Sequence, residues 1–286
     1  MSAQILDGKA LAQSIRLRLK SKVAHLCEKG EAPPHLVVVL VGQNVPSQIY
    51  VGHKIKACEE VGVLSTLLSY NENISEAELL GQIKTLSEDP TVDGILVQLP
   101  LPFHINNKLI LLAIDPLKDV DGFHPENIGL LTVNTPRLTP ATPRGIMELL
   151  EHHVRKLEGL HAVIVGASNI VGRPTALSLL NRRCTVSICH SKTQNLMAIT
   201  QQADLLVSAT GIHGLITANH VKPSAIVVDV GIHRLESGKV VGDVLFEEVA
   251  ERAAWITPVP GGVGPMTIAG LLENTFAARE LQRGHS

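Results

Sequence analysis

Apolar residues recur along the first part of the chain at spacings that alternate between a helical and an extended pattern. Leu11, Ile15, Leu19 and Val23 stand at four-residue steps between polar residues, which predicts an amphipathic helix over residues 5–30 that ends at Gly30. The unbroken apolar run LVVVLVG, residues 36–42, then predicts a parallel strand buried on both faces. This order is typical of the α/β fold class.

The same alternation continues through the next sixty residues. A helix is expected after the first strand, with Ser47 as its N-cap and Tyr50 in its first turn. A short strand over 64–69 follows, and then a helix that opens with a capping box of Ser75 and Glu78. The apolar segment GILVQLPLP, residues 94–102, predicts another buried strand. The β-α-β-α-β order predicts a three-layer α/β unit.

A second unit of this kind is expected after a looser segment. Residues 106–142 are rich in Pro, Gly and acidic residues and predict a long functional loop with a connector into a helix at 144–157. The elements expected beyond it are strands at 161–166, 185–190, 204–211 and 225–231, a hairpin at 233–244 that turns at 236–238, a last strand and a Gly-Pro loop in WITPVPGGVGPMT, and a helix at 267–283.

These patterns predict an α/β protein with two three-layer α/β domains. The first domain spans residues 1–140 and is completed by the C-terminal helix, 267–286. The second domain spans residues 141–266 and has the order of a Rossmann-like fold.

Composition and charge narrow the class of protein. The chain carries 25 Lys+Arg against 27 Asp+Glu, which leaves no basic excess for nucleic acid, and its aromatic content is only 2%. No apolar run approaches the roughly 20 residues of a membrane span, and no secretory signal opens the chain, so a cytoplasmic location is expected. The histidines and cysteines show no ligand spacing, so no metal site is expected.

A glycine-containing turn marks a candidate cofactor site. The strand at 161–166 runs into GASNIVGRP, residues 166–174, and then into a helix. Free N–H groups and the positive end of a helix favour a pyrophosphate at such a turn. Ser168 stands where the second glycine is usual, however, and the third glycine comes one position late. A simple tight turn is therefore the alternative.

The end of the next strand indicates which cofactor is bound. An NAD-specific domain usually has Asp or Glu there for the ribose hydroxyl, whereas this chain has His190, Ser191 and Lys192. A cation and a hydroxyl favour a 2′-phosphate, which predicts NADP. The alternative is that Lys192 is an ordinary solvated loop residue.

Three sets of polar residues in the first domain are candidates for chemistry. Tyr50 and Lys54 are four residues apart, which places them on one side of a helix. Gln98 stands at the carboxyl end of a buried strand, where open α/β sheets bind ligands, and Asp121 lies in the loop that follows. The alternative is a packed tyrosine, a solvated lysine and a turn aspartate. Short-chain dehydrogenases also use Tyr-x-x-x-Lys, but their glycine turn precedes it.

Eight segments in this order resemble one enzyme family. They are VPSQIYVGHKIKACEEVGV, DGILVQLPLP, KDVDGFHPENIG, TPATPRGI, GASNIVGRP, CHSKT, DVGI and TPVPGGVGPMT. Together they span nearly the whole chain and resemble the bifunctional methylenetetrahydrofolate dehydrogenase/methenyltetrahydrofolate cyclohydrolase (FolD-type) family. The resemblance implies NADP-dependent oxidation of 5,10-methylenetetrahydrofolate, hydrolysis to 10-formyltetrahydrofolate, and a homodimer.

The resemblance also implies roles for particular residues. Lys54 is expected to be the central catalytic group, Tyr50 to stack on the folate, Gln98 to assist Lys54 and Asp121 to hold the pterin. The remaining expected contacts are Val97, Leu99, Pro260, Gly261, Gly262, Val263 and Gly264 with the substrate, and Gly166, Ala167, Ser168, Ser191, Lys192 and Ile232 with the cofactor.

The chain departs from the family pattern at two positions. Many members have cysteine where Ala141 stands and arginine where Ala167 stands. Ala141 rules out a catalytic thiol, and Ala167 removes a phosphate contact, so that NAD use stays open. The alternatives are a dehydrogenase with weak cyclohydrolase activity and a folate- or nucleotide-binding regulator without turnover.

Overall fold

The computed structural model describes residues 2–154 and 156–284, which form two compact units. Unit 1 contains residues up to Ala12 and Thr142–Thr267, and unit 2 contains Gln13–Ala141 and the chain from Ile268 onward. The predicted boundary near residue 140 lies within two residues of this division. The first twelve residues group with unit 1, however, and not with the first domain as the sequence pattern suggested.

Unit 2 is built on a parallel sheet of three strands in the order β3-β2-β4. Residues 118–120 extend it, because Asp119 bridges to Ile95 beside β4. The strands are β2 (His35–Val41), β3 (Leu64–Tyr70) and β4 (Gly94–Val97), and the helices are α1 (Gly8–Glu28), α2 (Val45–Val61), α3 (Glu76–Glu88), α4 (Asn107–Leu112), α5 (Pro125–Thr132) and α10 (Val263–Gln282).

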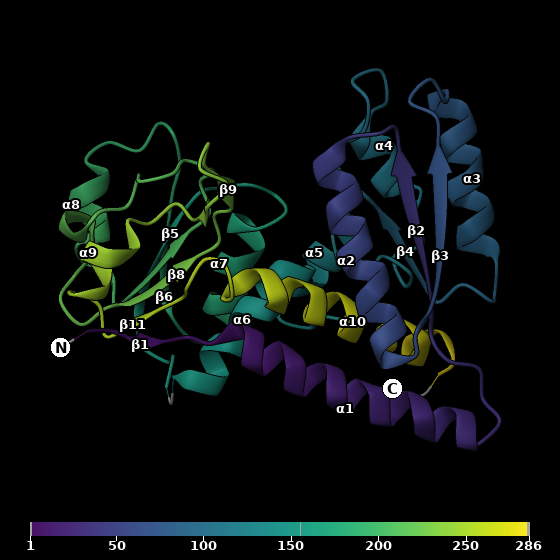
Figure 1. Ribbon diagram of the computed structural model, residues 1–286, viewed down its shortest axis with the longest axis horizontal. Coiled ribbons are helices and arrows are strands. Elements are labelled where there is room, and N and C mark those ends of the chain that lie inside the picture. The colour runs from purple at the N-terminus through teal and green to yellow at the C-terminus, as the bar shows by residue number, and fades with distance from the viewer. Residues whose placement is uncertain (1, 155, 285–286) are drawn as a thin grey trace. The chain divides into compact units, whose positions relative to one another are not determined.

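Helices cover both faces of this sheet, which gives the predicted three layers. Val37, Val39 and Val41 point to one face and pack with Leu79 and Ile83 of α3. Because side chains alternate along a strand, the intervening residues of β2 face the other side, and they are also buried. Figure 1 shows α2 and α3 on opposite sides of β2 and β3.

The C-terminal part of α10 belongs to unit 2. The buried amide of Asn274 donates to the main-chain oxygens of Val120, at 2.8 Å, and Thr139, at 2.7 Å. Arg279, also buried, donates to Glu31 Oε2 at 2.7 Å. The two Asn274 bonds satisfy the carbonyl groups on both sides of the 121–138 segment, so α10 fixes the residue that directly precedes Asp121.

Unit 1 contains a parallel sheet of six strands in the order β1-β11-β8-β7-β5-β6. The strands are β1 (Gln4–Ile5), β5 (His161–Val165), β6 (Thr185–Cys189), β7 (Leu205–Ser208), β8 (Ile226–Asp229) and β11 (Trp255–Ile256); the helices are α6 (Ala141–His153), α7 (Gly172–Asn181), α8 (Leu196–Thr200) and α9 (Phe246–Ala250), with one 3₁₀ turn, η1 (Ala218–His220). The separate hairpin of β9 (His233–Arg234) and β10 (Val240–Val241) is antiparallel, as predicted.

Both faces of this sheet are covered as well. Val163, Leu206 and Val227 share one buried cluster with Val249 of α9. Ile164 and Val207 point to the opposite face and are fully buried, and α7 packs against β5 and β6. The α/β fold class predicted from the sequence is therefore confirmed.

Several predicted boundaries are wrong. The N-cap of α2 is Asn44 and not Ser47: Asn44 Oδ1 accepts from the main-chain N of Ser47 at 3.0 Å, so Tyr50 lies in the second turn. The predicted loop over 106–142 contains α4 and α5. The predicted helix 144–157 is α6, which begins and ends earlier, and β4 ends at Val97. Residues 1, 155, 285 and 286, covered by these predictions, lie outside the described residues.

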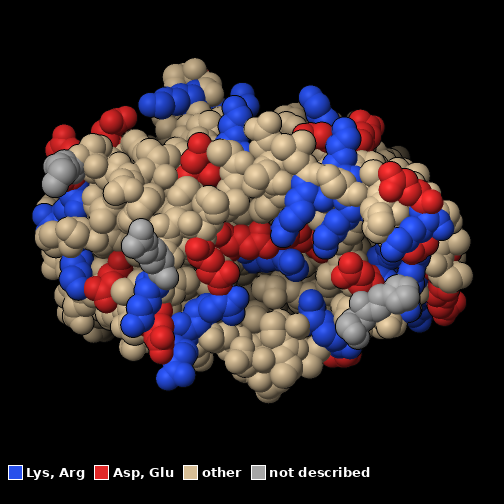
Figure 2. All heavy atoms as spheres, turned by 90° about the horizontal axis from the view of Figure 1, so that it is seen from below, with Lys and Arg blue, Asp and Glu red and all other residues tan. Residues whose placement is uncertain are grey.

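The hydropathy of the helices and the distribution of surface charge both bear on function. Among the helices that the structure describes, none is long and apolar enough to cross a membrane. Figure 2 shows acidic and basic side chains interleaved over the face in view, in keeping with their nearly equal numbers in the chain. That face therefore offers no continuous basic surface for a polyanion.

Replacing Asn274 by alanine should destabilise unit 2. The substitution leaves two buried carbonyl groups without their donor, which should cost about 2 to 4 kcal/mol. Urea unfolding followed by circular dichroism should show a lower midpoint for the first transition. Asn107→Ala, at an exposed position of α4, is the matched control and should change the midpoint little. Equal midpoints for the two variants would contradict the role assigned to Asn274.

Candidate functional site

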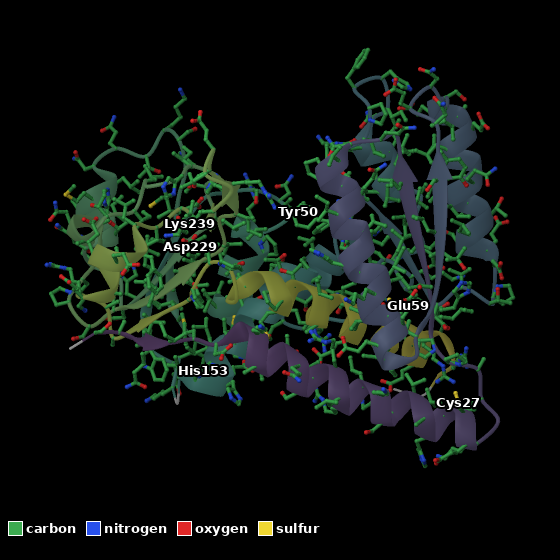
Figure 3. The ribbon with its side chains drawn as sticks, in the orientation of Figure 1. Cys27, Tyr50, Glu59, His153, Asp229 and Lys239 are labelled. Carbon is green, nitrogen blue, oxygen red and sulfur yellow. The ribbon has the colours of Figure 1, made fainter. Side chains whose placement is uncertain are left out.

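Lys54 and Gln98 meet at the carboxyl edge of the sheet in unit 2, and Tyr50 precedes Lys54 by one turn of α2. Tyr50 lies in the N-terminal half of α2, where Figure 3 labels it. It is 44% exposed, and Lys54, one turn later, is half-buried. Lys54 Nζ donates to Gln98 Oε1 at 3.0 Å. Gln98 follows β4 directly, and its main-chain N donates to Val39 O at 2.9 Å. The strand end therefore fixes the partner of the lysine.

The orientation of the Gln98 amide follows from a second bond. Its Nε2 donates to the main-chain oxygen of Leu99 at 2.7 Å. Because the nitrogen end of the amide is committed to that carbonyl, the oxygen end is presented to Lys54. Val97 and Leu99, the other predicted residues of this strand end, stand on either side of Gln98 in the chain.

Asp121 lies in the same unit and interacts electrostatically with Lys54. Burial raises the pKa of Asp121 to about 6, while the charge of Lys54 lowers it and that of Asp119 raises it. No described residue donates a hydrogen bond to the Asp121 carboxylate, and part of the side chain is accessible. The carboxylate is thus available to a ligand.

Asp119, two residues earlier, has a different role. Its buried carboxylate accepts from the main-chain N of Gly122 at 3.1 Å and of His124 at 2.8 Å, and from Asn127 Nδ2 at 3.0 Å. Desolvation raises the pKa of Asp119, and these bonds oppose the shift. Asp119 therefore shapes the turn that carries Asp121.

Cys58 offers no nucleophile beside the lysine. It follows Lys54 by four residues on α2 and is fully buried. Burial, with a smaller contribution from the Glu59 charge, raises the pKa of the Cys58 thiol to about 12. The thiol stays protonated near neutral pH and serves as a packing group.

The predicted glycine turn of unit 1 connects β5 to α7 and has the geometry of an anion cradle. Gly166 has φ +119°, and a Cβ on it would lie 2.2 Å from Ala209 O. A Cβ on Gly172 would lie 1.9 Å from Gly166 O. The main-chain N–H groups of residues 167–170 have no acceptor among the described residues. Such groups next to a helix N-terminus fit a pyrophosphate.

Ser168 and the end of β6 complete this cradle. Ser168 Oγ accepts from the main-chain N of Val171 at 3.2 Å and of Gly172 at 3.3 Å. Gly166 N donates to Cys189 O at 2.9 Å, which ties the turn to the last residue of β6. Ser191 and Lys192 follow with exposed side chains. The predicted cofactor residues of these two segments therefore lie at neighbouring strand ends.

Ile232 and the predicted substrate loop come together within unit 1. Ile232 is 50% exposed, and a Cβ on Gly264 would lie 3.9 Å from Ile232 Cδ1. The loop of residues 260–264 thus belongs to the same unit as the glycine turn, whereas Tyr50, Lys54, Gln98 and Asp121 belong to unit 2.

A buried network of two carboxylates was missed from the sequence. Asp243 Oδ2 accepts from Ser208 Oγ at 3.1 Å and from Thr210 N at 2.7 Å, and its Oδ1 lies 2.8 Å from His233 Nε2. Asp229, labelled at the end of β8 in Figure 3, accepts from the main-chain N of Asp243 at 3.0 Å. The network holds the loops after β7 and β8, and Ile232 lies in the second of these loops.

The two carboxyl groups differ in pKa. Burial raises the pKa of Asp229 to about 6, against hydrogen bonds from three main-chain N–H groups, and the Asp243 charge adds to the rise. Burial also acts on Asp243, but the hydrogen bonds from His233, Thr210 and Ser208 outweigh it and lower the pKa of that group. One carboxylate is therefore kept ionised beside one that protonates more readily. The glycine-aspartate pairings in DVG and VGD were the only sequence signal for this network.

Fold and site together define a class of protein. Unit 1 has the parallel sheet and the free N–H turn of a dinucleotide-binding fold, and unit 2 places a lysine, an amide and a free carboxylate at the end of a second parallel sheet. Among the described residues no group of three or more His, Cys, Asp and Glu side chains could hold a metal ion. The class is that of a two-unit, dinucleotide-binding α/β enzyme.

Comparison with known proteins identifies the family. Residues 6–121 match the catalytic domain of tetrahydrofolate dehydrogenase/cyclohydrolase, and residues 140–283 match its NAD(P)-binding domain. The chain belongs to the tetrahydrofolate dehydrogenase/cyclohydrolase family, and the resemblance stated from the sequence is confirmed.

Three solved structures illustrate the similarity. The bifunctional FolD enzyme from Campylobacter jejuni is 54% identical, with 98% of this chain and 99% of that chain covered and a TM-score of 0.96. A 5,10-methylenetetrahydrofolate dehydrogenase from the silkworm Bombyx mori is 44% identical over 99% of both chains, with a TM-score of 0.92. The Trypanosoma brucei enzyme, complexed with NADP and an inhibitor, is 35% identical over 98% of both, with a TM-score of 0.94.

Replacing Gly166 by alanine should strongly weaken cofactor binding. A Cβ at this position would overlap Ala209 O and would hold an unfavourable φ, so the turn must move away from its cradle geometry. Titration with NADP should show a loss of at least about 100-fold in affinity, on the scale of about 3 kcal/mol. Gly159→Ala is the control, since Gly159 has φ +82° but open space around it. Tight NADP binding by Gly166→Ala would contradict the cradle assignment.

Proposed function

We propose that this protein oxidises 5,10-methylenetetrahydrofolate with NADP to the 5,10-methenyl form and hydrolyses that product to 10-formyltetrahydrofolate. Membership of the family supports both activities, and the relative from Campylobacter jejuni is described as a bifunctional enzyme. The observation that carries the proposal is the hydrogen bond from Lys54 to Gln98 beside the free carboxylate of Asp121.

The oxidation needs alignment more than acid-base chemistry. A hydride leaves the one-carbon bridge because the two adjacent nitrogens stabilise the cation that remains, and bound NADP supplies the hydride acceptor. The protein has to hold the pterin and the nicotinamide in reacting geometry. The free N–H groups of residues 167–170 and the exposed side chain of Ile232 support a cofactor role for those segments of unit 1.

The hydrolysis needs proton transfers, which we assign to Lys54. Water adds to the methenyl carbon and gives up a proton. One carbon–nitrogen bond then breaks as that nitrogen is protonated, and the new hydroxyl group releases its proton to solvent as it becomes the formyl C=O. A positioned lysine can accept the first proton and return the second, a contribution of about 10²- to 10⁴-fold in rate. The same group thus serves both halves of the hydrolysis.

Gln98 suits a lysine that changes protonation state. Its amide oxygen carries no net charge and accepts a hydrogen bond from an ammonium or from a neutral amine alike. A carboxylate at the same distance would favour the charged form of a lysine. We therefore assign Gln98 the role of positioning Lys54.

The remaining substrate contacts are assigned on similarity to the family and on exposure. The exposed ring of Tyr50, one turn before Lys54, is suited to stack on the folate. Asp121 can accept two hydrogen bonds from the amidine-like edge of the pterin. The residues proposed to line the substrate are Val97, Leu99, Pro260, Gly261, Gly262, Val263 and Gly264.

Cofactor preference and assembly are part of the proposal. Ser191 and Lys192 favour NADP over NAD through the 2′-phosphate. A homodimer is supported by the free edge of β6 in unit 1, where Ile188 is 44% exposed, and by Leu180 of α7, which is 55% exposed. The cytoplasmic location stays a prediction.

Replacing Lys54 by methionine should abolish the hydrolysis and leave NADP binding almost intact. In the unmodified protein, methylenetetrahydrofolate and NADP should yield the methenyl intermediate, followed by its decay to the formyl product, both observed by absorbance. Methionine keeps the length of the side chain but cannot move a proton, so methenyl decay should slow by about 10²-fold or more.

The outcomes of this experiment separate the rival functions. Lys56→Met, exposed on the same helix, is the matched control and should turn over normally. Unchanged methenyl decay in Lys54→Met would exclude the assigned role. Accumulation of the intermediate by the unmodified protein would indicate a monofunctional dehydrogenase, and binding of both ligands without turnover would indicate a regulator.

Folate affinity should depend on pH through Asp121. Its pKa of about 6 means that the carboxylate is ionised above pH 6 and becomes protonated below it, where it can no longer accept both hydrogen bonds. The dissociation constant of a stable folate analogue should be constant between pH 7 and 8 and should rise about tenfold per unit below pH 6. Asp121→Asn should bind more weakly at pH 7.5 and lose this dependence. A flat profile for the unmodified protein would refute the assignment.

A further inference from the structure

The first turn of α7 carries a positive charge at the positive end of the helix. Arg173 follows Gly172, the first residue of α7, and the turn contains no acidic residue. A cation is unfavourable at this end of a helix, where the free N–H groups already concentrate positive charge. A local rule broken in this way is typical of a functional position.

The guanidinium of Arg173 is held over the glycine turn. Side chains near a helix N-terminus lean back toward it, and Arg173 Nε donates to the main-chain oxygen of Ala167 at 3.0 Å. The main-chain N of Arg173 also donates to Ser168 O, at 3.0 Å. Among the described residues nothing accepts from the two terminal nitrogens of Arg173. The guanidinium group of Arg173 is therefore oriented by one hydrogen bond, and its two terminal nitrogens are available to bind an anion.

The segment that orients this guanidinium group is connected to the part of the fold that binds the adenosine ribose of a dinucleotide. Ala167 comes directly after Gly166, whose N–H is bonded to Cys189 at the end of β6. Neighbouring strands are about 4.8 Å apart. The residue whose carbonyl orients the guanidinium thus directly follows the residue that is hydrogen-bonded to the end of β6, and the end of the strand in this place contacts the adenosine ribose in dinucleotide-binding folds.

We propose that Arg173 binds the 2′-phosphate of NADP and, with Lys192, sets the preference for NADP over NAD. Ala167 offers only a methyl group at the position where a cation would otherwise stand, and Arg173 supplies the charge from the first turn of α7 instead. This inference rests on the proposed use of NADP. Arg173 acts as a specificity residue and takes no part in the hydride or proton transfers.

The pyrophosphate is a less suitable partner for this side chain. The N–H groups of residues 167–170 already provide donors for a pyrophosphate, and the dipole of α7 adds its positive end. Arginine, by contrast, gives a planar fork that binds a phosphate monoester through two parallel bonds. Loss of Arg173 should therefore weaken ligands that carry a 2′-phosphate and spare those that lack it.

The test is direct binding to the full-length protein without folate. Calorimetry with adenosine 2′,5′-bisphosphate and NADP should show a loss of about 10- to 100-fold for Arg173→Ala, as expected for charged hydrogen bonds. AMP and NAD, which lack the 2′-phosphate, should change by less than about threefold on the same scale. Arg173→Lys should retain part of the affinity. Arg182→Ala, at the other end of α7 where Arg182 pairs with Glu151, is the control and should bind all four ligands normally.

A rescue variant tests whether charge near the turn is the cause. Adding Ala167→Arg to Arg173→Ala should restore most of the preference for the bisphosphate over AMP. Equal losses for both kinds of ligand in Arg173→Ala would assign Arg173 to the pyrophosphate, and unchanged affinity would leave Lys192 as the sole cation; either result overturns the proposal. Binding of neither NADP nor NAD by the unmodified protein would instead refute the proposed cofactor, and the inference with it.

Discussion

Parallel pairing of the strands is the constraint on which both units depend. In each main sheet every strand pair is parallel, so the carboxyl ends of the strands fall along one edge. The pairing of Val39 with Val97 places Gln98 beyond the last pair of β2 and β4, where its side chain reaches Lys54. A slip of one residue would turn Gln98 to the opposite face of the sheet. The register of a hydrophobic strand thus determines the position of the residue that accepts the hydrogen bond of Lys54.

Main-chain groups at such an edge leave the strand ladder and need other partners. Buried carboxylates supply them: Asp119 binds the turn after residue 120, while Asp229 and Asp243 bind the loops after β7 and β8. Each accepts several N–H bonds, and each therefore acts on the backbone. Asp121 differs because no described residue donates to it. The hydrogen-bond partners, and not the residue type, distinguish the carboxylates that hold the backbone at this edge from the Asp121 carboxylate, which accepts no hydrogen bond from a described residue.

The sequence predicted what depends on local pattern and failed where distant contacts decide. Runs such as residues 36–42 specify buried parallel strands because both faces must be apolar. The pairing of β1 with β11 joins residues 4–5 to residues 255–256. A strand of two residues is too short to show an apolar pattern, so this pairing could not be predicted from the sequence. Asn44 prevailed over Ser47 as the N-cap because Pro46 fits the first turn of the helix. The helices α4 and α5 are too short for a clear hydrophobic period.

The candidate site likewise contains features that depend on local sequence and features that depend on contacts between distant residues. Lys54 and Gln98 are 44 residues apart in the chain, so the strand-end position of Gln98 suggested a shared ligand edge but could not specify their hydrogen bond. The glycine turn could be predicted from the sequence because its steric requirements are local: Gly166 and Gly172 lie close together within the same turn. The unusual sequence of this turn, with Ser168 in the second glycine position, also has a local explanation. Ser168 Oγ takes the N–H groups of Val171 and Gly172, so the free N–H groups lie in residues 167–170, ahead of the helix. An anion bound there lies next to the main-chain oxygen that orients Arg173, and the serine in the second glycine position thereby brings the cradle and the cation together.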